Sequence, residues 1–252
     1  MRKEPFGENS IIHVFNRGNR KQKIVNDEGD RWHFLQMLFY FNDKFAPTNT
    51  FRTLKELLRL DLNSRLYLNS RLIWPDEWST RENLVKIIAF CLRDNHFHLI
   101  LQEIKEGGVT KFMQKLGVGM TNYFNTKHKE TGRLFQGSYK ARLVDTDNYL
   151  KYLSVYIQVK NVLESYPGGV ENALLNFNDA YQFALDYKYG SLGAQIFKNL
   201  ETNKIIDNKI LTDFFENDEY KNFARDCLSR VSFDESQSKL IVEIKSQQLV
   251  EI

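Results

Sequence analysis

Two histidines separated by one residue, His96-Phe97-His98, follow a predicted tight turn at residues 93–95. If this segment is a strand, its side chains alternate, so both imidazoles project from one face and Phe97 projects from the other. Two imidazoles on one face can bind a single divalent metal ion. Histidines spaced in this way also occur in strands where they form only local hydrogen bonds. The spacing alone leaves both interpretations open.

A second candidate for chemistry is a predicted helix over residues 147–163, which carries Tyr149, Tyr152, Tyr156 and Lys160. The first tyrosine, Tyr156 and Lys160 fall near one stripe of the helix. Tyrosines on a helix commonly pack at the edge of a core. A phenol is also a nucleophile when a cation polarises the electrophile beside it, and a metal held by two histidines would do so to a phosphodiester.

The apolar pattern predicts the elements that must position these side chains. Strands are predicted at 11–15, 84–92, 96–104 and 134–144, with Gly137 as a possible bulge, and the second and third form a hairpin. Helices are predicted at 26–41, 110–127 and 147–163. This order predicts an α+β fold, a ferredoxin-like or RRM-like antiparallel sheet with helices on one face, and a helical insertion at about 42–82.

The clearest break is Tyr166-Pro167-Gly168-Gly169, and it coincides with a reversal of charge. The net charge of +3 divides into +8 for residues 1–165, with 26 basic and 18 acidic side chains, and −5 for residues 166–252. We therefore predict a basic domain over 1–165 and an acidic helical C-terminal extension over 166–252. Residues 105–142 hold eight basic and two acidic residues, which is typical either of a solvated helix face or of a polyanion-binding region.

Several function classes are disfavoured by the composition. The longest apolar run, Ile87–Leu92, is far too short for a membrane span, and the first five residues resemble no secretory signal. Two cysteines cannot form a disulfide framework, and no phosphate-binding glycine motif of the Walker type is present. We expect a cytoplasmic protein without a membrane partner or a nucleotide cofactor.

Several blocks, taken in order, resemble the single-tyrosine HUH transposases, in the branch of insertion-sequence-200-like and REP-associated tyrosine transposases. The segment 89–101 resembles the strand with the HUH motif, and residues 13–19 resemble the opening strand and turn. Residues 111–116 and 123–125 resemble the central helix, and 131–140 resemble a characteristic glycine-, glutamine- and lysine-containing segment. Residues 147–150 and 156–159 resemble the helix that carries the nucleophile.

This resemblance implies a DNA transposase that nicks and joins single strands at hairpin-flanked sites. His96 and His98 would bind Mg²⁺ or Mn²⁺, and Tyr156 would attack the scissile phosphate to give a 5′-phosphotyrosine and a free 3′-OH. Tyr149 and Tyr152 are alternative nucleophiles. Family members are monomers or dimers, so a homodimer is an open possibility.

The third metal ligand of the family, an Asn or Gln one turn after the tyrosine, is replaced by Lys160. Protonated lysine has no lone pair for a metal. Asn161 is the next candidate, but it lies about 140° around a regular helix from Tyr156 and requires local unwinding of the helix.

Candidate DNA contacts come from the first turn, the basic region and the tyrosine helix: Arg17, Arg20, Lys21, Lys111, Lys115, Lys127, Arg133, Lys140, Arg142 and Lys160. Two alternatives to the active transposase remain. The replacement at Lys160 favours a catalytically inactive or domesticated nucleic-acid-binding regulator on the same fold. A metal-dependent phosphohydrolase that activates water would need more acidic or histidine ligands nearby than the sequence offers.

Overall fold

The computed structural model describes residues 6–47, 49–57, 71–215 and 219–230. The N-terminal part contains strands and helices in the order β1 (Ile11–Arg17), α1 (Glu28–Tyr40), α2 (Thr50–Leu57), β2 (Val85–Leu92), β3 (His96–Glu103), α4 (Gly108–His128) and β4 (Lys140–Val144). A short 3₁₀ turn, η1 (Asn19–Lys21), follows β1.

A helix in three pieces then follows β4: α5 (Asp147–Val155), the π-helical turn η2 (Tyr156–Lys160) and α6 (Asn161–Leu163). The described C-terminal elements are α7 (Gly169–Leu175), α8 (Phe177–Leu185), α9 (Leu192–Ile196), η3 (Glu201–Lys204), α10 (Lys209–Thr212) and α11 (Glu219–Arg230). None of the helices within these described ranges has the length and apolar character that crossing a membrane requires.

The four strands form one antiparallel sheet in the order β2-β3-β1-β4. This order, with α1 and α4 as the crossovers, is the ferredoxin-like arrangement, and it confirms the predicted fold class. In the register of the sheet, His98 of β3 lies opposite Phe15 of β1 and Cys91 of β2. The two faces of the sheet therefore receive alternate residues of each strand.

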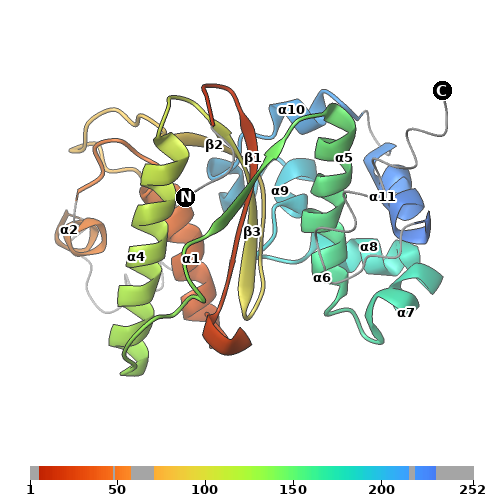
Figure 1. Ribbon diagram of the computed structural model, residues 1–252, viewed down its shortest axis with the longest axis horizontal. Helices are drawn as coiled ribbons and strands as arrows, with labels where there is room; N and C mark the ends of the chain where they lie inside the picture. The colour runs from red at the N-terminus through yellow and green to blue at the C-terminus, as the bar shows by residue number, and fades with distance from the viewer. Residues whose placement is uncertain (1–5, 48, 58–70, 216–218, 231–252) are drawn as a thin grey trace.

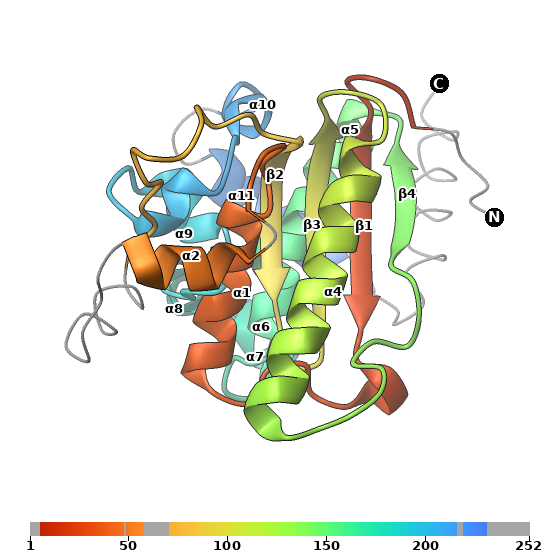
Figure 2. The same ribbon diagram turned by 90° about the vertical axis from the view of Figure 1, so that its left-hand side faces the viewer.

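The face that we call the apolar face packs against α1 and α4, which lie side by side across it (Figure 2). Its strand residues include Ile12, Val14, Phe97 and Leu99, and all are buried. Burial of Phe97 agrees with the prediction that it points into the core. A capping box at Asp27, whose side chain accepts a hydrogen bond from the backbone of Asp30, fixes the start of α1.

The opposite face, which we call the histidine face, carries His13, Phe15, His96 and His98. The helix α5–α6 and the C-terminal helices cover it (Figure 1). The helices between the strands thus lie on one face, as predicted. The second face has a cover that the sequence patterns did not assign.

Residues on both sides of the break at 166–169 contribute to one hydrophobic core. Sheet residues such as Cys91 and Ile100 pack in this core together with Leu153 of α5, Phe177 of α8 and Tyr220 of α11. The backbone of residues 189–191 also hydrogen-bonds along β2, where Ser191 donates to the carbonyl of Phe90 at 3.0 Å. The described part of the extension therefore covers an edge of the sheet, and the division of the chain at residue 165 stays a prediction.

The fourth predicted strand differs from the structure. The fourth strand begins at Lys140, not at Leu134, because residues 134–139 form no strand and make one isolated bridge, between Phe135 and Gly18. Leu134 and Phe135 are buried plugs of the core, and the ring centroid of Phe135 lies 5.8 Å from that of Phe97. Apolar residues that fill a core outside a strand give the same hydrophobic signal as a strand.

The insertion predicted to be helical at about 42–82 contains α2, whose described residues end at Leu57. Residues 58–70 of the insertion lie outside the described ranges.

Candidate active site

The two histidines of β3 lie on the histidine face, as their alternation predicted. The ring centroids of His96 and His98 are 5.2 Å apart with the planes at 86°, and His98 is 2% exposed. Phe97 between them packs against Phe34 of α1 on the apolar face. The strand alone is sufficient to direct both imidazoles toward one place.

Hydrogen bonds at Nδ1 orient both imidazoles. Nδ1 of His96 lies 2.7 Å from Oδ1 of Asn95, and because this amide oxygen only accepts, the imidazole donates. Nδ1 of His98 lies 2.9 Å from Nε2 of His13, inside the core. In each ring the remaining nitrogen, Nε2, is the atom that a metal would use.

Burial keeps these imidazoles neutral. It lowers the pKa of His96 to about 4, and the charges of Arg93 and Arg17 act in the same direction while Glu164 opposes them. Burial also lowers the pKa of His98 well below its ordinary value and that of His13 to about 3. A neutral imidazole has the lone pair that metal binding needs, so the environment suits a metal site near neutral pH.

Tyr156 is the helix tyrosine that reaches the histidines. Its ring meets that of His98 edge to face, with centroids 5.5 Å apart and planes at 88°. Nζ of Lys160 lies 5.3 Å from the centroid of the same tyrosine ring and pairs with Glu164 at 2.6 Å. One chain is therefore sufficient to bring together a strand histidine, a phenol and a cation.

The other two tyrosines of this helix have different surroundings. Tyr149 is buried in the core formed by the helices that cover the histidine face. Tyr152 packs against Phe223 of α11, with ring centroids 5.3 Å apart. The edge-to-face ring contact with His98 makes Tyr156 the candidate that lies at the strand histidines.

The helix unwinds locally at the tyrosine. In the π-turn η2 the backbone N–H of Asn161 donates to the carbonyl of Tyr156, five residues earlier. A π-turn contains one residue more than an α-turn, so Asn161 lies closer to the stripe of Tyr156 than a regular helix would place it. This is the unwinding that Asn161 needs if it is to join the two histidines.

Asn161 also has an unsatisfied amide. The residue is 1% exposed, and its buried Nδ2 atom has no hydrogen-bond partner among the described residues. The oxygen and nitrogen of an amide are exchanged by a simple flip, so the unsatisfied position can equally be the oxygen. Two neutral imidazoles and a buried amide oxygen form a donor set that fits a divalent metal.

Buried hydrogen bonds to the C-terminal extension anchor the π-turn. Nε2 of Gln158 donates to Oγ of Ser191 at 2.9 Å and to Oε1 of Gln195 at 3.0 Å. The hydroxyl of Tyr220 donates to Oε1 of Gln158 at 2.8 Å. Gln158 is therefore a structural residue of this turn, and its side chain is directed toward the extension.

Part of the predicted basic set lies around the histidine face. Arg17 is exposed at the end of β1, and the exposed residues Arg20 and Lys21 follow in η1 with φ of 52° and 63°. On β4, Arg142 lies opposite His13 and Lys140 lies opposite Phe15. Lys140 is exposed, and Arg142 is half-buried.

The lysines of α4 belong to the other face, and two of them have internal partners. Nζ of Lys115 donates to the carbonyl of Asp43 at 2.6 Å. Nζ of Lys127 pairs with Asp27 at 2.7 Å and with the fully buried Asp30 at 2.6 Å. We therefore leave Lys115 and Lys127 out of the candidate interface. Lys111 is exposed on the same helix, and Arg133 is exposed in the loop that follows it.

Asp27, Asp30 and His128 have ligand atoms within 4.8 Å of one another, a spacing compatible with a cation. The ammonium of Lys127 already contacts both carboxylates there. The pKa of Asp30 is lowered to about 2, because hydrogen bonds from Lys127 and from the backbone of Asn26 outweigh the effect of burial. This cluster joins α1 to α4 and is separate from the candidate active site.

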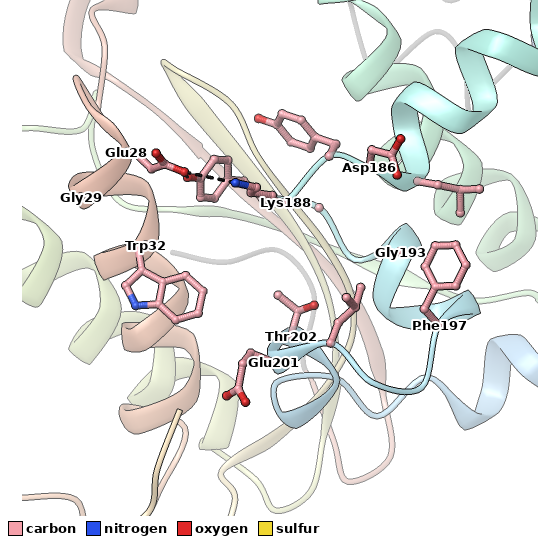
Figure 3. A pocket seen from close by; sticks show the side chains of 14 residues that line it. Glu28, Gly29, Trp32, Asp186, Lys188, Gly193, Phe197, Glu201 and Thr202 are labelled. Carbon is pink, nitrogen blue, oxygen red and sulfur yellow. Dashed lines mark hydrogen bonds and ion pairs between the residues drawn. The ribbon is translucent and has the colours of Figure 1, made fainter. Parts of the chain in front are cut away.

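A pocket of about 770 Å³ lies away from the histidines, between α1 and residues 185–202 (Figure 3). Trp32 and Phe197 face it from the two sides, and Glu28 pairs with Lys188 across its rim at 3.6 Å. None of the candidate catalytic residues lines it.

Two residues at the candidate site, His13 and Glu164, were not predicted from the sequence. His13 was part of the opening strand of the resemblance, and its partnership with His98 spans 85 positions in the chain. Glu164 lies one helical turn after Lys160, and this spacing of opposite charges was a signal for their pairing.

Comparison with known proteins gives one family match and one structural likeness to report. Residues 76–160 match the family described as "Transposase IS200 like". A solved structure described as "Structure of the REP associates tyrosine transposase bound to a REP hairpin" aligns with 79% of this chain and 86% of that chain, at 10% identity and a TM-score of 0.41. Among curated proteins, none matches significantly.

The matched family segment runs from just before β2 to the end of the π-turn, and it contains His96, His98 and Tyr156. Over this segment the chain is similar to the IS200-like transposases.

Proposed function

We propose that this protein is a transposase that cleaves and rejoins single-stranded DNA through a covalent bond to Tyr156. The observation that carries the proposal is the edge-to-face contact between Tyr156 and His98, beside the second strand histidine. The contact supports the proposal because a phenol and two neutral imidazoles, the groups that the reaction needs, lie together on one face of the sheet. The family match supports a strand transferase as the class of enzyme.

His96, His98 and Asn161 are the residues that would hold a divalent metal, Mg²⁺ or Mn²⁺. When bound, such an ion polarises a phosphodiester by withdrawing charge from a non-bridging oxygen. Nε2 of each imidazole and the amide oxygen of the asparagine would be the ligand atoms. The partners at Nδ1 keep the two rings in place for this role.

Tyr156 supplies the nucleophile. Its phenol oxygen forms a bond to phosphorus as the bond between phosphorus and the 3′ oxygen breaks, which leaves a 5′-phosphotyrosine and a 3′-OH. The phenol loses a proton and the 3′ oxygen gains one, so the step needs no oxidant and no nucleotide. Attack of a 3′-OH on the phosphotyrosine reverses the step and joins the strands.

Lys160 lies beside this phenol and stabilises negative charge that develops on it. The lysine is 11% exposed in its side chain, so its charge is only partly screened by water. Its pairing with Glu164 fixes the ammonium on the tyrosine side of the helix.

DNA with a hairpin and a flanking single strand is the proposed substrate. Arg17, Arg20, Lys21, Lys140 and Arg142 would neutralise its phosphates around the histidine face. Lys111, on the apolar-face side, and Arg133 are more distant candidates that belong to the predicted set.

The decisive experiment incubates the full chain with labelled hairpin single strands and Mn²⁺ and resolves the products by denaturing electrophoresis. We expect a covalent protein–DNA species that Tyr156→Phe abolishes. Tyr152→Phe is the matched control on the same helix, and it should form the adduct at close to the wild-type rate. Adduct formation by Tyr156→Phe would overturn the assignment of the nucleophile.

A second candidate function is a nucleic-acid-binding regulator without catalysis. It is favoured by one observation, the ion pair of Lys160 and Glu164 at the helix position where a neutral metal ligand is expected. This candidate predicts hairpin binding that weakens steeply with salt, without a covalent species under any metal condition.

A further inference from the structure

His13 lies behind one of the candidate metal ligands. It is on β1, two residues before Phe15, which lies opposite His98 in the sheet. The side chain is 3% exposed, and its Nε2 atom lies 2.9 Å from Nδ1 of His98. The two rings stack with their centroids 5.2 Å apart at 22°. His13 is therefore the buried hydrogen-bond partner of this ligand.

A hydrogen bond between two neutral imidazoles has two arrangements of the proton. In the first, Nδ1–H of His98 donates to Nε2 of His13, and the lone pair of His98 is on its Nε2. In the second, His13 donates, and Nε2 of His98 carries a hydrogen that blocks a metal. The choice between these arrangements decides whether His98 can be a ligand through Nε2.

The surroundings of the pair favour the first arrangement. His96, the neighbouring ligand, donates from Nδ1 to Asn95 and so has its lone pair on Nε2. If His98 has the same tautomer, the lone pairs on Nε2 of both histidines are directed into the site. Nε2 of His13, at 2.9 Å from Nδ1 of His98, is in position to accept this hydrogen bond.

We propose that His13 is a positioning residue: it accepts a hydrogen bond from Nδ1 of His98 and holds that ring in the tautomer and orientation that present Nε2 to a metal. This inference rests on the proposed function, because it assigns a role toward the metal that His96 and His98 would bind. His13 itself touches neither the metal nor the DNA.

The first test is the tautomer of His98 in the metal-free full chain. Long-range ¹H–¹⁵N correlation spectra of protein labelled with ¹⁵N-histidine distinguish a protonated from an unprotonated ring nitrogen. We expect Nδ1 of His98 to be protonated and Nε2 to be unprotonated at pH 7.5, and His13→Phe to change this pattern. A wild-type spectrum with Nε2 protonated would overturn the inference, whether or not the protein binds metal.

The second test measures Mn²⁺ binding by electron paramagnetic resonance in the absence of DNA. Loss of a partner behind a metal ligand typically lowers affinity about 10- to 100-fold, and we expect this for His13→Phe. His13→Gln should stay within about threefold of wild type, because its amide oxygen can accept the same hydrogen bond. Cys91→Ala removes a buried side chain beside His98 without its hydrogen bond, and it is the control for lost packing.

The outcomes separate this inference from the proposed function. If wild type binds Mn²⁺ and His13→Phe binds it equally well, the positioning role is wrong and the metal site stands. If wild type has the expected tautomer but binds no Mn²⁺, the proposed metal site is wrong and the hydrogen-bond assignment stands. If His13→Phe does not fold, the comparison of His13→Gln with Cys91→Ala and the wild-type spectrum still decide the question.

Discussion

The two faces of the sheet are made from alternate residues of the same strands, yet they differ in what they bury. β3 directs Phe97, Leu99 and Leu101 toward α1 and α4, and its last residue, Glu103, adds a buried polar side chain to this face. The same strand directs His96 and His98 toward the tyrosine helix. The buried imidazoles there are held neutral and linked by hydrogen bonds.

The difference extends to the helices that cover each face. On the apolar face α4 is a helix of 21 residues, and two of its lysines, Lys115 and Lys127, contact groups of the same layer. On the histidine face the covering helix contains a π-turn at the proposed nucleophile and is anchored to the extension through Gln158. We conclude that the central strand residues of the apolar face supply apolar packing, while those of the histidine face bury polar side chains that belong to the candidate site.

The largest expected effect separates neighbours on β3. Phe97→Ala should lower the free energy of unfolding by about 3–5 kcal/mol, because it leaves a cavity in the apolar face. The Phe97→Ala variant should still form the adduct at temperatures below its own melting temperature. His96→Ala should instead abolish the adduct with a much smaller loss of stability. Urea unfolding measures stability, and the gel assay measures adduct formation. Loss of the adduct in Phe97→Ala together with a large loss of stability in His96→Ala would refute the assignment of packing to one face and of catalysis to the other.

A smaller effect is expected at the anchor of the π-turn. Gln158→Leu removes the buried hydrogen bonds to Tyr220 and Ser191, which keep only Ser154 and the backbone N–H of Phe90 as partners, and this should cost about 1–3 kcal/mol of unfolding free energy. The rate of adduct formation should fall as well, since the turn positions Tyr156. Gln182→Leu on the exposed side of α8 is the matched control and should stay within about 0.5 kcal/mol of wild type. Equal stability of the two variants would contradict an anchoring role for Gln158.

Acid should weaken the histidine face through its buried imidazoles. The pKa of His13 is about 3 in the folded chain, below the ordinary value of 6.5. The unfolded chain therefore takes up a proton first as the pH falls below 6.5, and stability is lost progressively toward pH 3. When the pH falls from 7 to 5.5, the free energy of unfolding of metal-free His13→Phe should decrease by about 1 kcal/mol less than that of wild type. Urea unfolding at pH 7 and at pH 5.5 tests this prediction. An equal loss of stability in wild type and in His13→Phe would contradict it.

The smallest effect distinguishes the two groups of basic residues. Arg142→Gln should weaken hairpin binding a few-fold and reduce the slope of log affinity against log salt by about 1, as expected for one lost phosphate contact. Lys127→Gln should leave that slope unchanged, because its ammonium pairs with Asp27 and Asp30. Fluorescence anisotropy at several salt concentrations measures both slopes. A lower slope for the Lys127 variant would place α4 in the DNA interface.

Local patterns predicted most of the fold. Alternation in β3 was sufficient to place His96, His98 and Phe97 correctly, and the helix predicted at 26–41 is α1. The start of β4 was wrong, because buried residues such as Phe135 look like strand residues when they fill a core without pairing. Tertiary packing determines where such residues are buried, and a short window of sequence carries no information about that packing.

The candidate site was predictable only where one element determines it. The contact of Tyr156 with His98 followed from the family resemblance, but no local signal revealed the π-turn that moves Asn161. The hydrogen bond of His13 to His98 depends on the pairing of β1 with β3, far apart in the sequence. The extension that anchors Gln158 was predicted as an acidic appendage, because its buried polar partners are isolated residues without a motif.

The central claim is that Tyr156 forms the covalent bond to DNA, and peptide mapping of the trapped adduct tests it most directly. Trypsin separates residues 143–151, which contain Tyr149, from residues 152–160, which contain Tyr152 and Tyr156. Fragmentation of the second peptide then distinguishes its two tyrosines. We predict a 5′-phosphate on Tyr156 in the wild-type, Mn²⁺-loaded reaction. A phosphate on Tyr149 or Tyr152, or hydrolysed DNA without any adduct, would contradict the account.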